Sequence, residues 1–518
     1  MTEGNGEVRE LPKGWLWSNA STVCSSVRDG THDTPKYVEN GIPLVTSKNL
    51  KKGQIDFSTA KFISYEDHCQ ISIRSGVESG DILFAMIGTI GNPVVIEGNQ
   101  EFSIKNVGLF KKNESAINSY FLSFWLSSHI FEKISEEKQL IKGTTQKFIP
   151  LGNLRALPIP LPPINEQERI VEKIEELFSD VDQGVESLKT AQKQLKVYRQ
   201  AVLKWAFEGK LTEAWRSQQP TLKTGEALLA QIKAERENRY QQQLAEWEEK
   251  VREWEAIGKV GKKPSKPQEL KELLSLTEAE FFQLPLLPGS WTYTYLAYTG
   301  DLGRGKSKHR PRNDPKLFGG SYPFIQTGDV KAAKGVLRKF SQTYNELGLS
   351  QSKLWAEGTL CITIAANIAE TCFLGIEACF PDSIVGFTTY PKIIDSKYVD
   401  YFIQSTKAKI TAFAPATAQK NINLETLENL LVPYCLAEEQ EEIVQEIESR
   451  LSICDQLEAT ITENLQKVEA LRQSILKQAF EGKLVPQDPN DEPAEKLLER
   501  IRAERQEKEP QKTSKPLR

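Results

Sequence analysis

The sequence predicts an α+β protein in which two similar globular domains are joined by two long antiparallel coiled-coil helices, with an internal pseudo-two-fold repeat. Three observations lead to this prediction. Sequence segments recur about 273 positions apart, a heptad pattern of apolar residues follows each recurring start, and the region before each heptad pattern alternates short apolar runs with Gly, Pro and Asn. A chain of 518 residues has room for several domains, because an ordinary domain has roughly 100–200 residues.

The internal repeat is the strongest signal. Residues 166–175 read EQERIVEKIE and residues 439–448 read EQEEIVQEIE. The same shift carries LKWAFEGKL (203–211) onto LKQAFEGKL (476–484), and an opening with Leu-Pro and Trp recurs at 11–15 and 287–291. This ordered series indicates a duplicated domain-plus-helix unit, because its period is far too long for a solenoid.

The repeat fixes the expected domain boundaries. We expect an N-terminal tail (1–10), a first domain (11–163), a central helical part (164–286), a second domain (287–437) and a distal helical part (438–518). Within the domains, the apolar runs predict strands at 81–88, 93–98, 359–369 and 371–380. Amphipathic patterns predict short helices at 118–134 and 395–412.

The long helices are expected to start after Pro162-Pro163 and Pro433 and to end at Gly209 and Gly482. Each would hold about 42 residues and span roughly 63 Å. Lone surface helices are the alternative, but a seam this narrow favours pairing with the other copy. Gly184, Arg450 and Asn464 would be weak or polar layers. The predicted seam residues are Ile170, Ile174, Leu177, Val181, Leu188, Leu195 and Val202 in the first helix, and Ile443, Ile447, Cys454, Leu457, Ile461, Val468, Leu471 and Ile475 in the second.

A shorter repeat follows each long helix, where residues 226–236 (EALLAQIKAER) resemble residues 495–505 (EKLLERIRAER). The first copy then carries an additional charged helix at 238–255 and a Gly/Lys/Pro linker at 258–267. We expect this extra segment to be a solvent-exposed extension and spacer without chemistry of its own.

Composition excludes several classes of protein. The longest uncharged apolar stretch, 281–300, is interrupted by Pro285, Pro288 and Gly289, which argues against a membrane span. The first ten residues are acidic and lack the apolar region of a secretory signal. Seven scattered Cys form no CxxC pair and only four His accompany them. This pattern predicts buried free thiols in a cytoplasmic protein, with no metal site and no cofactor.

The sequence holds one weak catalytic motif. Residues 300–307 fit the phosphate-binding pattern GxxxxGK[ST]. That loop needs a helix that starts at its lysine, whereas KHRPRNDP follows here and its Pro311 opposes a helix. The sequence contains no GxSxG or HExxH motif, no paired His/Cys metal spacing and no glycine-rich dinucleotide fingerprint, and we therefore predict no catalytic residue.

Binding chemistry remains. The loop 304–312 (RGKSKHRPR) is dense in Lys and Arg, which suits phosphate neutralisation and guanine readout, although a role in solubility alone is the alternative. The segments TSKN (46–49) and QTGD (326–329) follow apolar strands and carry side chains able to contact base edges. TTQK (144–147) and TAQK (417–420) precede the helices, where a helix cap is the alternative. The candidate DNA-binding residues are Arg28, Thr31, His32, Lys36, Thr46, Ser47, Lys48, Asn49, Gln146, Lys147, Arg304, Lys306, Lys308, His309, Arg310, Arg312, Gln326, Thr327, Asp329, Gln419 and Lys420.

The two-copy plan, the LP…W openings, the TxQK segments, the EQE helix starts and the AFEGKL ends resemble the specificity subunits of type I restriction–modification systems. The resemblance covers nearly the whole chain. It implies two target-recognition domains that each read one half of a bipartite double-stranded DNA target, and paired helices that act as a spacer. It also implies two methyltransferase subunits as partners, translocase/endonuclease subunits that join for restriction, and a chain that is itself non-catalytic.

The distribution of charge fits such a division of roles. The whole chain has a net charge of −4, yet residues 11–163 carry +2 and residues 287–437 carry +4, so the acidity lies in the helices and tails. Two other functions stay open on the sequence alone. One is a coiled-coil scaffold without a DNA role, and the other is a nucleotide-binding enzyme that uses the motif at 300–307.

Overall fold

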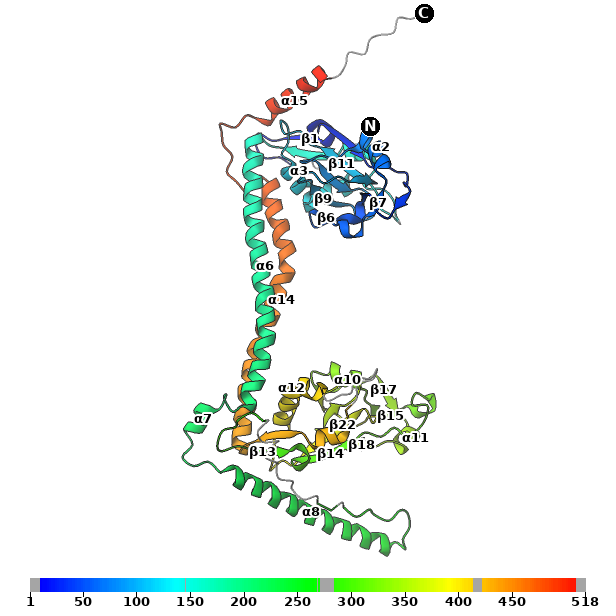
Figure 1. Cartoon of the computed structure of the whole chain (residues 1–518), viewed down its shortest axis with the longest axis vertical. Helices are drawn as coiled ribbons and strands as arrows, with labels where there is room; N and C mark the ends of the chain where they lie inside the picture. Colours follow the sequence, from blue (N-terminus) through cyan, green and yellow to red (C-terminus); the bar gives the residue numbers. More distant parts are fainter. Residues whose placement is uncertain (1–9, 145, 268, 271–283, 413–421, 509–518) are drawn as a thin grey trace, which may run out of the picture. The chain divides into compact units, whose positions relative to one another are not determined.

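The computed structural model describes residues 10–144, 146–267, 269–270, 284–412 and 422–508. The chain divides into two compact units, of which the first comprises Met1–Thr190 with Ile461–Arg518 and the second comprises Ala191–Thr460. Two helices of 44 residues, α6 (Ile164–Phe207) and α14 (Ala437–Phe480), each contribute residues to both units (Figure 1).

The first unit contains two four-stranded sheets. One is antiparallel, in the order β2 (Ser26–Asp29), β11 (Val107–Lys111), β8 (Ile82–Ala85) and β9 (Gly91–Val95). The other has the order β10 (Ser103–Lys105), β4 (Ile42–Thr46), β7 (Lys61–Ile63) and β3 (Tyr37–Val38), with β10 parallel to β4. Two strand pairs complete it: β1 (Leu16–Asn19) with β12 (Pro158–Leu161), and β5 (Leu50–Lys51) with β6 (Gln54–Ile55). Its shorter helices are α1 (Ala20–Val23), η1 (Ser47–Asn49), η2 (Phe57–Thr59), α2 (Tyr65–Ser75), α3 (Ser119–Leu126), α4 (His129–Glu137), α5 (Leu151–Arg155) and α15 (Ala494–Lys508).

The second unit repeats this plan with one more strand in its main sheet. That sheet has the order β14 (Gly300–Arg304), β22 (Ile384–Thr389), β19 (Leu360–Thr363), β20 (Thr371–Leu374) and β16 (Gly335–Leu337). The other sheets are β17 (Gln342–Tyr344), β15 (Phe318–Phe324), β21 (Ala378–Cys379) and β18 (Leu354–Trp355), and the pair β13 (Thr292–Tyr295) with β23 (Leu431–Tyr434). Its shorter helices are α7 (Glu213–Ser217), α8 (Gly225–Ala256), η3 (Leu296–Tyr298), η4 (Pro315–Leu317), α10 (Thr327–Ala332), α11 (Glu346–Ser350), α12 (Ser396–Ala412) and α13 (Leu424–Glu428).

The first four strands of the two main sheets correspond one to one, which confirms the predicted repeat. Two helix predictions need correction. The helix expected at 118–134 is broken into α3 and α4, because the Ser128 hydroxyl accepts from Phe131 N and starts a new helix. The charged helix expected at 238–255 is not separate, since it continues the preceding helix without a break to form α8.

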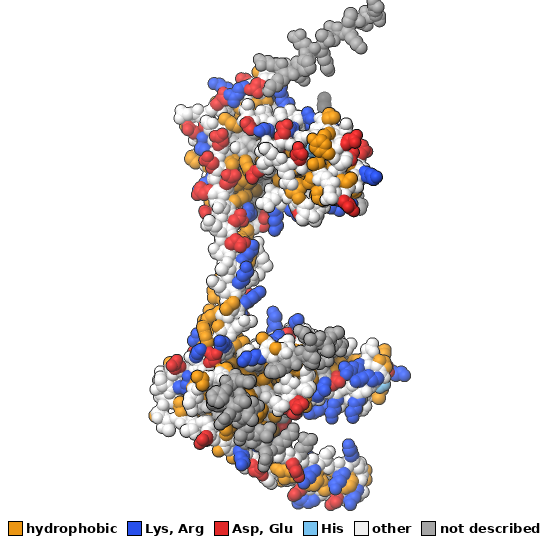
Figure 2. All heavy atoms as spheres, in the orientation of Figure 1, with side chains coloured by type: hydrophobic (Ala, Val, Ile, Leu, Met, Phe, Trp, Pro, Cys, Tyr) orange, Lys and Arg blue, Asp and Glu red, His pale blue; other side chains and the backbone are white. Residues whose placement is uncertain are grey.

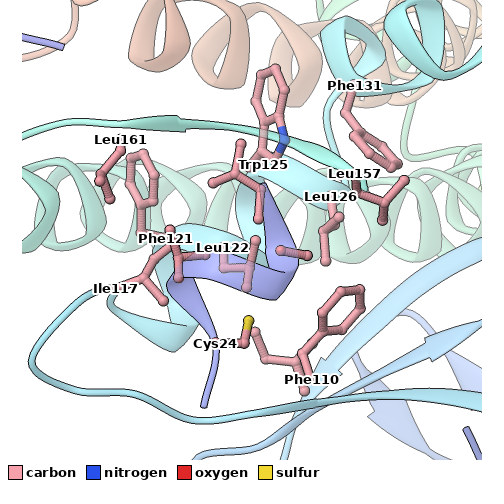
Figure 3. Packing of buried hydrophobic residues seen from close by; sticks show 14 of the residues in the cluster. Cys24, Phe110, Ile117, Phe121, Leu122, Trp125, Leu126, Phe131, Leu157 and Leu161 are labelled. Atoms are coloured by element: carbon pink, nitrogen blue, oxygen red, sulfur yellow. The ribbon is translucent and has the colours of Figure 1, made fainter. Parts of the chain in front are cut away.

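Each domain core includes the residues that pack it against the long helices. In the first unit, Phe121, Trp125 and their neighbours fill the space between the sheet and the helices (Figure 3). Trp125 is 1% exposed, and its indole N–H donates to the carbonyl of Pro158 at 2.8 Å. In this unit the start of α6 (Ile170, Ile174) packs with the end of α14 (Ile475). In the second unit the end of α6 (Val202) packs with the start of α14 (Ile443, Ile447), so the two helices are antiparallel.

The apolar seam of the helix pair is real, but two of the predicted seam residues lie outside it, at positions where the seam is shifted by one residue. Ile447, Cys454, Ile461 and Ile475 are buried as predicted, and Val468 is half-buried. The predicted seam residues Leu457 and Leu471 are 48% and 50% exposed. The next residue along the helix is half-buried in place of each exposed seam position. These half-buried residues are Glu458, Leu465 and Arg472 in α14, and Val185 and Arg199 in α6.

These one-residue shifts move the polar layers of the seam and do not remove them, because Glu458, Arg199 and Arg472 take the shifted positions. Gly184 and Asn464 are exposed, and Arg450 pairs with Glu446 of its own helix at 2.9 Å. Leu177, Val181, Leu188 and Leu195 are half-buried, as expected for a seam between only two helices. No helix among the described residues is long and apolar enough to cross a membrane.

Candidate nucleic-acid interface

Each domain is fastened to the helix pair by the same buried tryptophan–glutamate hydrogen bond. The indole N–H of Trp15 donates to Glu166 Oε1 at 3.1 Å in the first unit. In the second unit, the indole N–H of Trp291 donates to Glu439 Oε2 at 2.9 Å. Both glutamates are only 1% exposed. The LP…W opening and the EQE helix start therefore recur together because they bind each other.

The glutamine of each EQE segment supports the same junction. Gln167 Oε1 accepts from Asn118 N at 2.8 Å, and its Nε2 donates to Pro162 O at 3.1 Å. Gln440 makes the equivalent bonds in the second unit, accepting from Asp395 N at 2.9 Å and donating to Cys435 O at 2.8 Å. Each buried amide thus joins a long helix to the start of the domain helix beside it.

The AFEGKL ends close the other side of each junction. Gly209 and Gly482 both have positive φ angles, of +72° and +66°, which glycine adopts without strain. A Cβ atom on Gly209 would lie 2.5 Å from Pro288 Cγ, and one on Gly482 would lie 2.5 Å from Pro12 Cγ. In both units the glycine at the end of the long helix therefore packs closely against the proline of the LP…W opening.

The two buried glutamates differ in their charge partners. Glu439 accepts from the Arg216 guanidinium at 2.5 Å and from the Thr212 hydroxyl at 2.8 Å. Glu166 has Gln487 Nε2 at 3.4 Å in place of a cation. Burial therefore raises the pKa of the Glu166 carboxyl above its ordinary value of 4.5, and hydrogen bonds from Trp15 and Gln487 oppose that rise.

Two ion pairs between α6 and α14 lie one repeat period apart. Arg199 pairs with Asp455 in the second unit, and Arg472 pairs with Asp182 in the first. Adding 273 to 199 and 182 gives 472 and 455, so these are the same contact made from each of the two helices. Each arginine occupies a shifted seam position and reaches an exposed aspartate, so both pairs lie at the edge of the helix interface.

The polar segments 46–49 and 326–329, which we expected to contact base edges, form helix caps in the two domains. Asn49 is 3% exposed, its Oδ1 accepts from Thr46 N at 2.9 Å, and its Nδ2 donates to Asp56 O at 3.0 Å. Asp329 likewise accepts from Gln326 N at 2.8 Å. The structure thus gives Asn49 and Asp329 a structural role. Lys48 and Gln326 are exposed beside these caps, whereas Ser47 and Thr327 are half-buried.

The first candidate loop, 28–36, is built on a buried carboxylate. Asp29 is 3% exposed and pairs with Arg74, and it lies 2.9 Å from His32 Nε2. His32 Nδ1 is 2.9 Å from Asn106 Oδ1, and Arg28 donates to Arg74 O at 2.7 Å. Lys36 is exposed and Thr31 is half-buried. The loop is therefore tied to α2 through Arg74 and to Asn106 through His32.

The basic loop 304–312 contains two kinds of side chain. Arg304 and Arg312 donate to Asp382 at 2.8 and 2.7 Å, and Arg310 donates to the carbonyl of Ser307 at 2.6 Å. His309 Nε2 lies 2.9 Å from Asp314 Oδ2. Lys306 and Lys308 are exposed, and no acidic side chain of the described residues pairs with them. The arginines thus brace the loop and the two lysines project their charge into solvent.

The geometry rules out the nucleotide-binding loop considered at 300–307. Residues Gly300–Arg304 form strand β14, paired with β22, and the next helical turn is η4 at Pro315–Leu317. No helix begins at Lys306, so its backbone N–H groups cannot form the phosphate cradle. In the part of the chain that the structure describes, no three His, Cys, Asp or Glu side chains are placed to hold a metal ion.

The TxQK segments can be placed in the first domain only. Gln146 and Lys147 are exposed, and the carbonyl of Lys147 accepts from Gly88 N at 2.9 Å, next to strand β8. They are not the cap of the long helix, which starts at Ile164. Gln419 and Lys420 lie outside the described residues.

Two copies of one α+β domain, each fastened to the same helix pair by the same buried contacts and each carrying exposed polar loops, define a duplicated binding protein. A family model described as the type I restriction modification DNA specificity domain matches residues 35–196 and 298–467. The chain therefore belongs to the type I restriction–modification DNA specificity family.

Individual relatives align over most of the chain. The type I restriction enzyme EcoKI specificity subunit of Escherichia coli (strain K12) is 24% identical, with 96% of each chain covered. The EcoDI specificity subunit of Escherichia coli is 26% identical over 80% of this chain and 84% of its own. Among solved structures, the HsdS subunit from Thermoanaerobacter tengcongensis superposes with a TM-score of 0.56 at 17% identity, covering 93% of this chain and 100% of that one. This last likeness shows that the fold is shared.

Proposed function

We propose that this chain gives a type I restriction–modification complex its DNA sequence specificity, with each domain reading one half of an asymmetric bipartite target. The observation that carries the proposal is the contrast between recurring attachment contacts and different loops. The Trp–Glu, Gln and Gly–Pro contacts recur in both units, whereas the exposed loops at 28–36 and 304–312 differ in sequence and charge. Two domains that are attached through recurring contacts but carry different loops are suited to binding two different half-sites.

The loop 304–312 provides the contact to test first. We expect K306A/K308A to weaken binding of the assembled complex to its DNA target and to reduce the salt slope of log K by about 1.8, because each phosphate contact contributes about 0.9. K306R/K308R should keep the slope, since the charge is retained. An unchanged slope in K306A/K308A would remove this loop from the DNA contacts.

The helix pair offers a surface for the methyltransferase subunits. In the second unit, Ile453 and Leu457 lie one helical turn apart on α14 and are 55% and 48% exposed. Large apolar side chains exposed together on one face commonly mark a protein interface. Docking of methyltransferase there would bring catalysis to the bound DNA, and translocase/endonuclease subunits would join the same assembly for restriction.

The docking surface is tested by co-purification. I453D/L457D should reduce recovery of methyltransferase with this chain. The matched control is S452D/A459D, which places two carboxylates at exposed positions on another face of the same helix and should leave recovery unchanged. Thermal unfolding of the isolated chain should be unaffected in both variants. Full recovery with I453D/L457D would place the methyltransferase elsewhere.

A further inference from the structure

The extension of α8 in the second unit ends in a segment that is rich in lysine and fixed in place. Residues 258–267 read GKVGKKPSKP and contain four lysines and no acidic residue. We call them the lysine segment. Lys259, Lys262, Lys263 and Lys266 are all exposed. Lys259 lies 3.8 Å from Glu255, while no described acidic side chain pairs with the other three.

Two tryptophans hold the lysine segment against the helix. The indole N–H of Trp247 donates to Pro264 O at 3.1 Å, and that of Trp254 donates to Gly261 O at 3.2 Å. Both rings belong to a heptad stripe on α8 that also includes Tyr240, Leu244 and Val251, all half-buried. A spacer needs no such fastening, because an unrestrained Gly/Lys/Pro chain would serve as well. These two hydrogen bonds attach the backbone of the lysine segment to α8, so its lysines are displayed beside the helix.

The base of α8 is tied directly to the strand that leads into the basic loop. Arg239 pairs with Asp301 of β14 at 3.1 Å and lies over the ring of Tyr390 at 4.5 Å. Arg236 lies over the ring of Tyr298 at 4.6 Å. The basic loop and the lysine segment therefore belong to one compact unit. Figure 2 shows Lys and Arg on the part of the second domain that faces the end of α8, and both Lys/Arg and Asp/Glu at the end of α8 itself.

We propose that the lysine segment is a second phosphate-binding surface, which contacts the DNA backbone next to the half-site bound by the second domain. This inference rests on the proposed DNA-binding function. Lysine carries a strongly hydrated point charge and lacks the planar fork with which arginine reads bases. The segment would accordingly add affinity and salt dependence without adding sequence preference. The first unit has no such extension among its described residues, since α15 there corresponds only to the base of α8.

The test measures DNA binding by the complex of the full chain with its methyltransferase partner, using a duplex that contains the target. We expect K262A/K263A/K266A to reduce the salt slope by about 2.7, at about 0.9 for each lysine. The ratio of affinities for target and non-target duplexes should stay the same. K262R/K263R/K266R should behave like the natural chain.

The matched control is K223A/K233A/R252A, which removes the same charge from exposed positions outside the lysine segment. An unchanged slope in K262A/K263A/K266A, or an equal decrease in the control, would overturn the inference. Loss of methyltransferase co-purification with an unchanged slope would also overturn it, in favour of a protein contact. If the natural complex did not distinguish target from non-target DNA, the proposed function itself would fail, which is a separate outcome.

Discussion

Replacing Arg216 with alanine should destabilise the second unit strongly. The change leaves Glu439, which is 1% exposed, without its cation. Removing one partner of a buried ion pair costs about 3–5 kcal/mol. The hydrogen bonds from Thr212 and Trp291 to Glu439 remain, so we expect the lower limit, about 3 kcal/mol. At about 2–4 °C per kcal/mol for a unit of this size, Tm should fall by about 6–12 °C.

The assay is differential scanning calorimetry of the full chain, in which the transition of the second unit should move. The double variant R216A/E439Q should recover most of the loss, because a neutral glutamine can still bond Trp291 and Thr212 without a buried charge. R169A is the comparison variant in the first unit, where Arg169 is 32% exposed, against 13% for Arg216, and pairs with Asp491 at 2.6 Å; a smaller decrease in Tm is expected. A decrease below about 2 °C in R216A, or no recovery in the double variant, would refute the reasoning.

Three further predictions concern the helices and the first unit. I461A should lower the free energy of unfolding, measured with urea, by about 2–4 kcal/mol, and L457A should lower it by less than about 0.5 kcal/mol, because only Ile461 is buried. Equal decreases would show that Leu457 lies in the seam, as the sequence predicts. Reversing the pair in R199D/D455R should retain the helicity measured by circular dichroism better than R199D alone, since only the double variant keeps opposite charges in contact; equal helicity in the two variants would remove the pair from the determinants of register. Relative to E166Q, the natural chain should lose stability as pH rises from 4.5, because the pKa of Glu166 is raised in the folded state and the folded protein binds its proton more tightly; parallel stability curves would contradict this.

The sequence predicts the duplication, the fold class and the ends of both long helices, because these features leave local signals. The proline before α6, the glycine ends and the period-seven apolar residues can be read without knowing what lies across the fold. The start predicted at Pro433 is wrong, because Pro433 lies within β23 and α14 begins at Ala437. Local signals do not show which of two adjacent sets of heptad positions in α14 faces α6. The two phases of α14 each contain two leucines and two polar residues, at 450, 457, 464 and 471 or at 451, 458, 465 and 472.

Contacts between distant residues decide between these phases. Arg472 and Arg199 reach Asp182 and Asp455 on the partner helix, and local periodicity carries no information about such pairs. The candidate interface shows the same limit. The density of Lys and Arg at 304–312 identifies an exposed loop, but only the structure distinguishes the bracing arginines from the lysines that face solvent. The roles of Asn49 and Asp329 as caps could have been recognised from their spacing to Thr46 and Gln326, which fits a capping box.

The most direct test of the two-domain account is to exchange residues 11–163 for the corresponding domain of another family member and to map methylated positions in the DNA of cells that express the complex. The incoming domain should carry Pro and Trp at positions 12 and 15, so that it makes the same contacts with Gly482 and Glu166 and is attached in the same way. We predict that one half of the recognised sequence changes while the other half stays the same. A change in both halves, or in neither, would contradict the account.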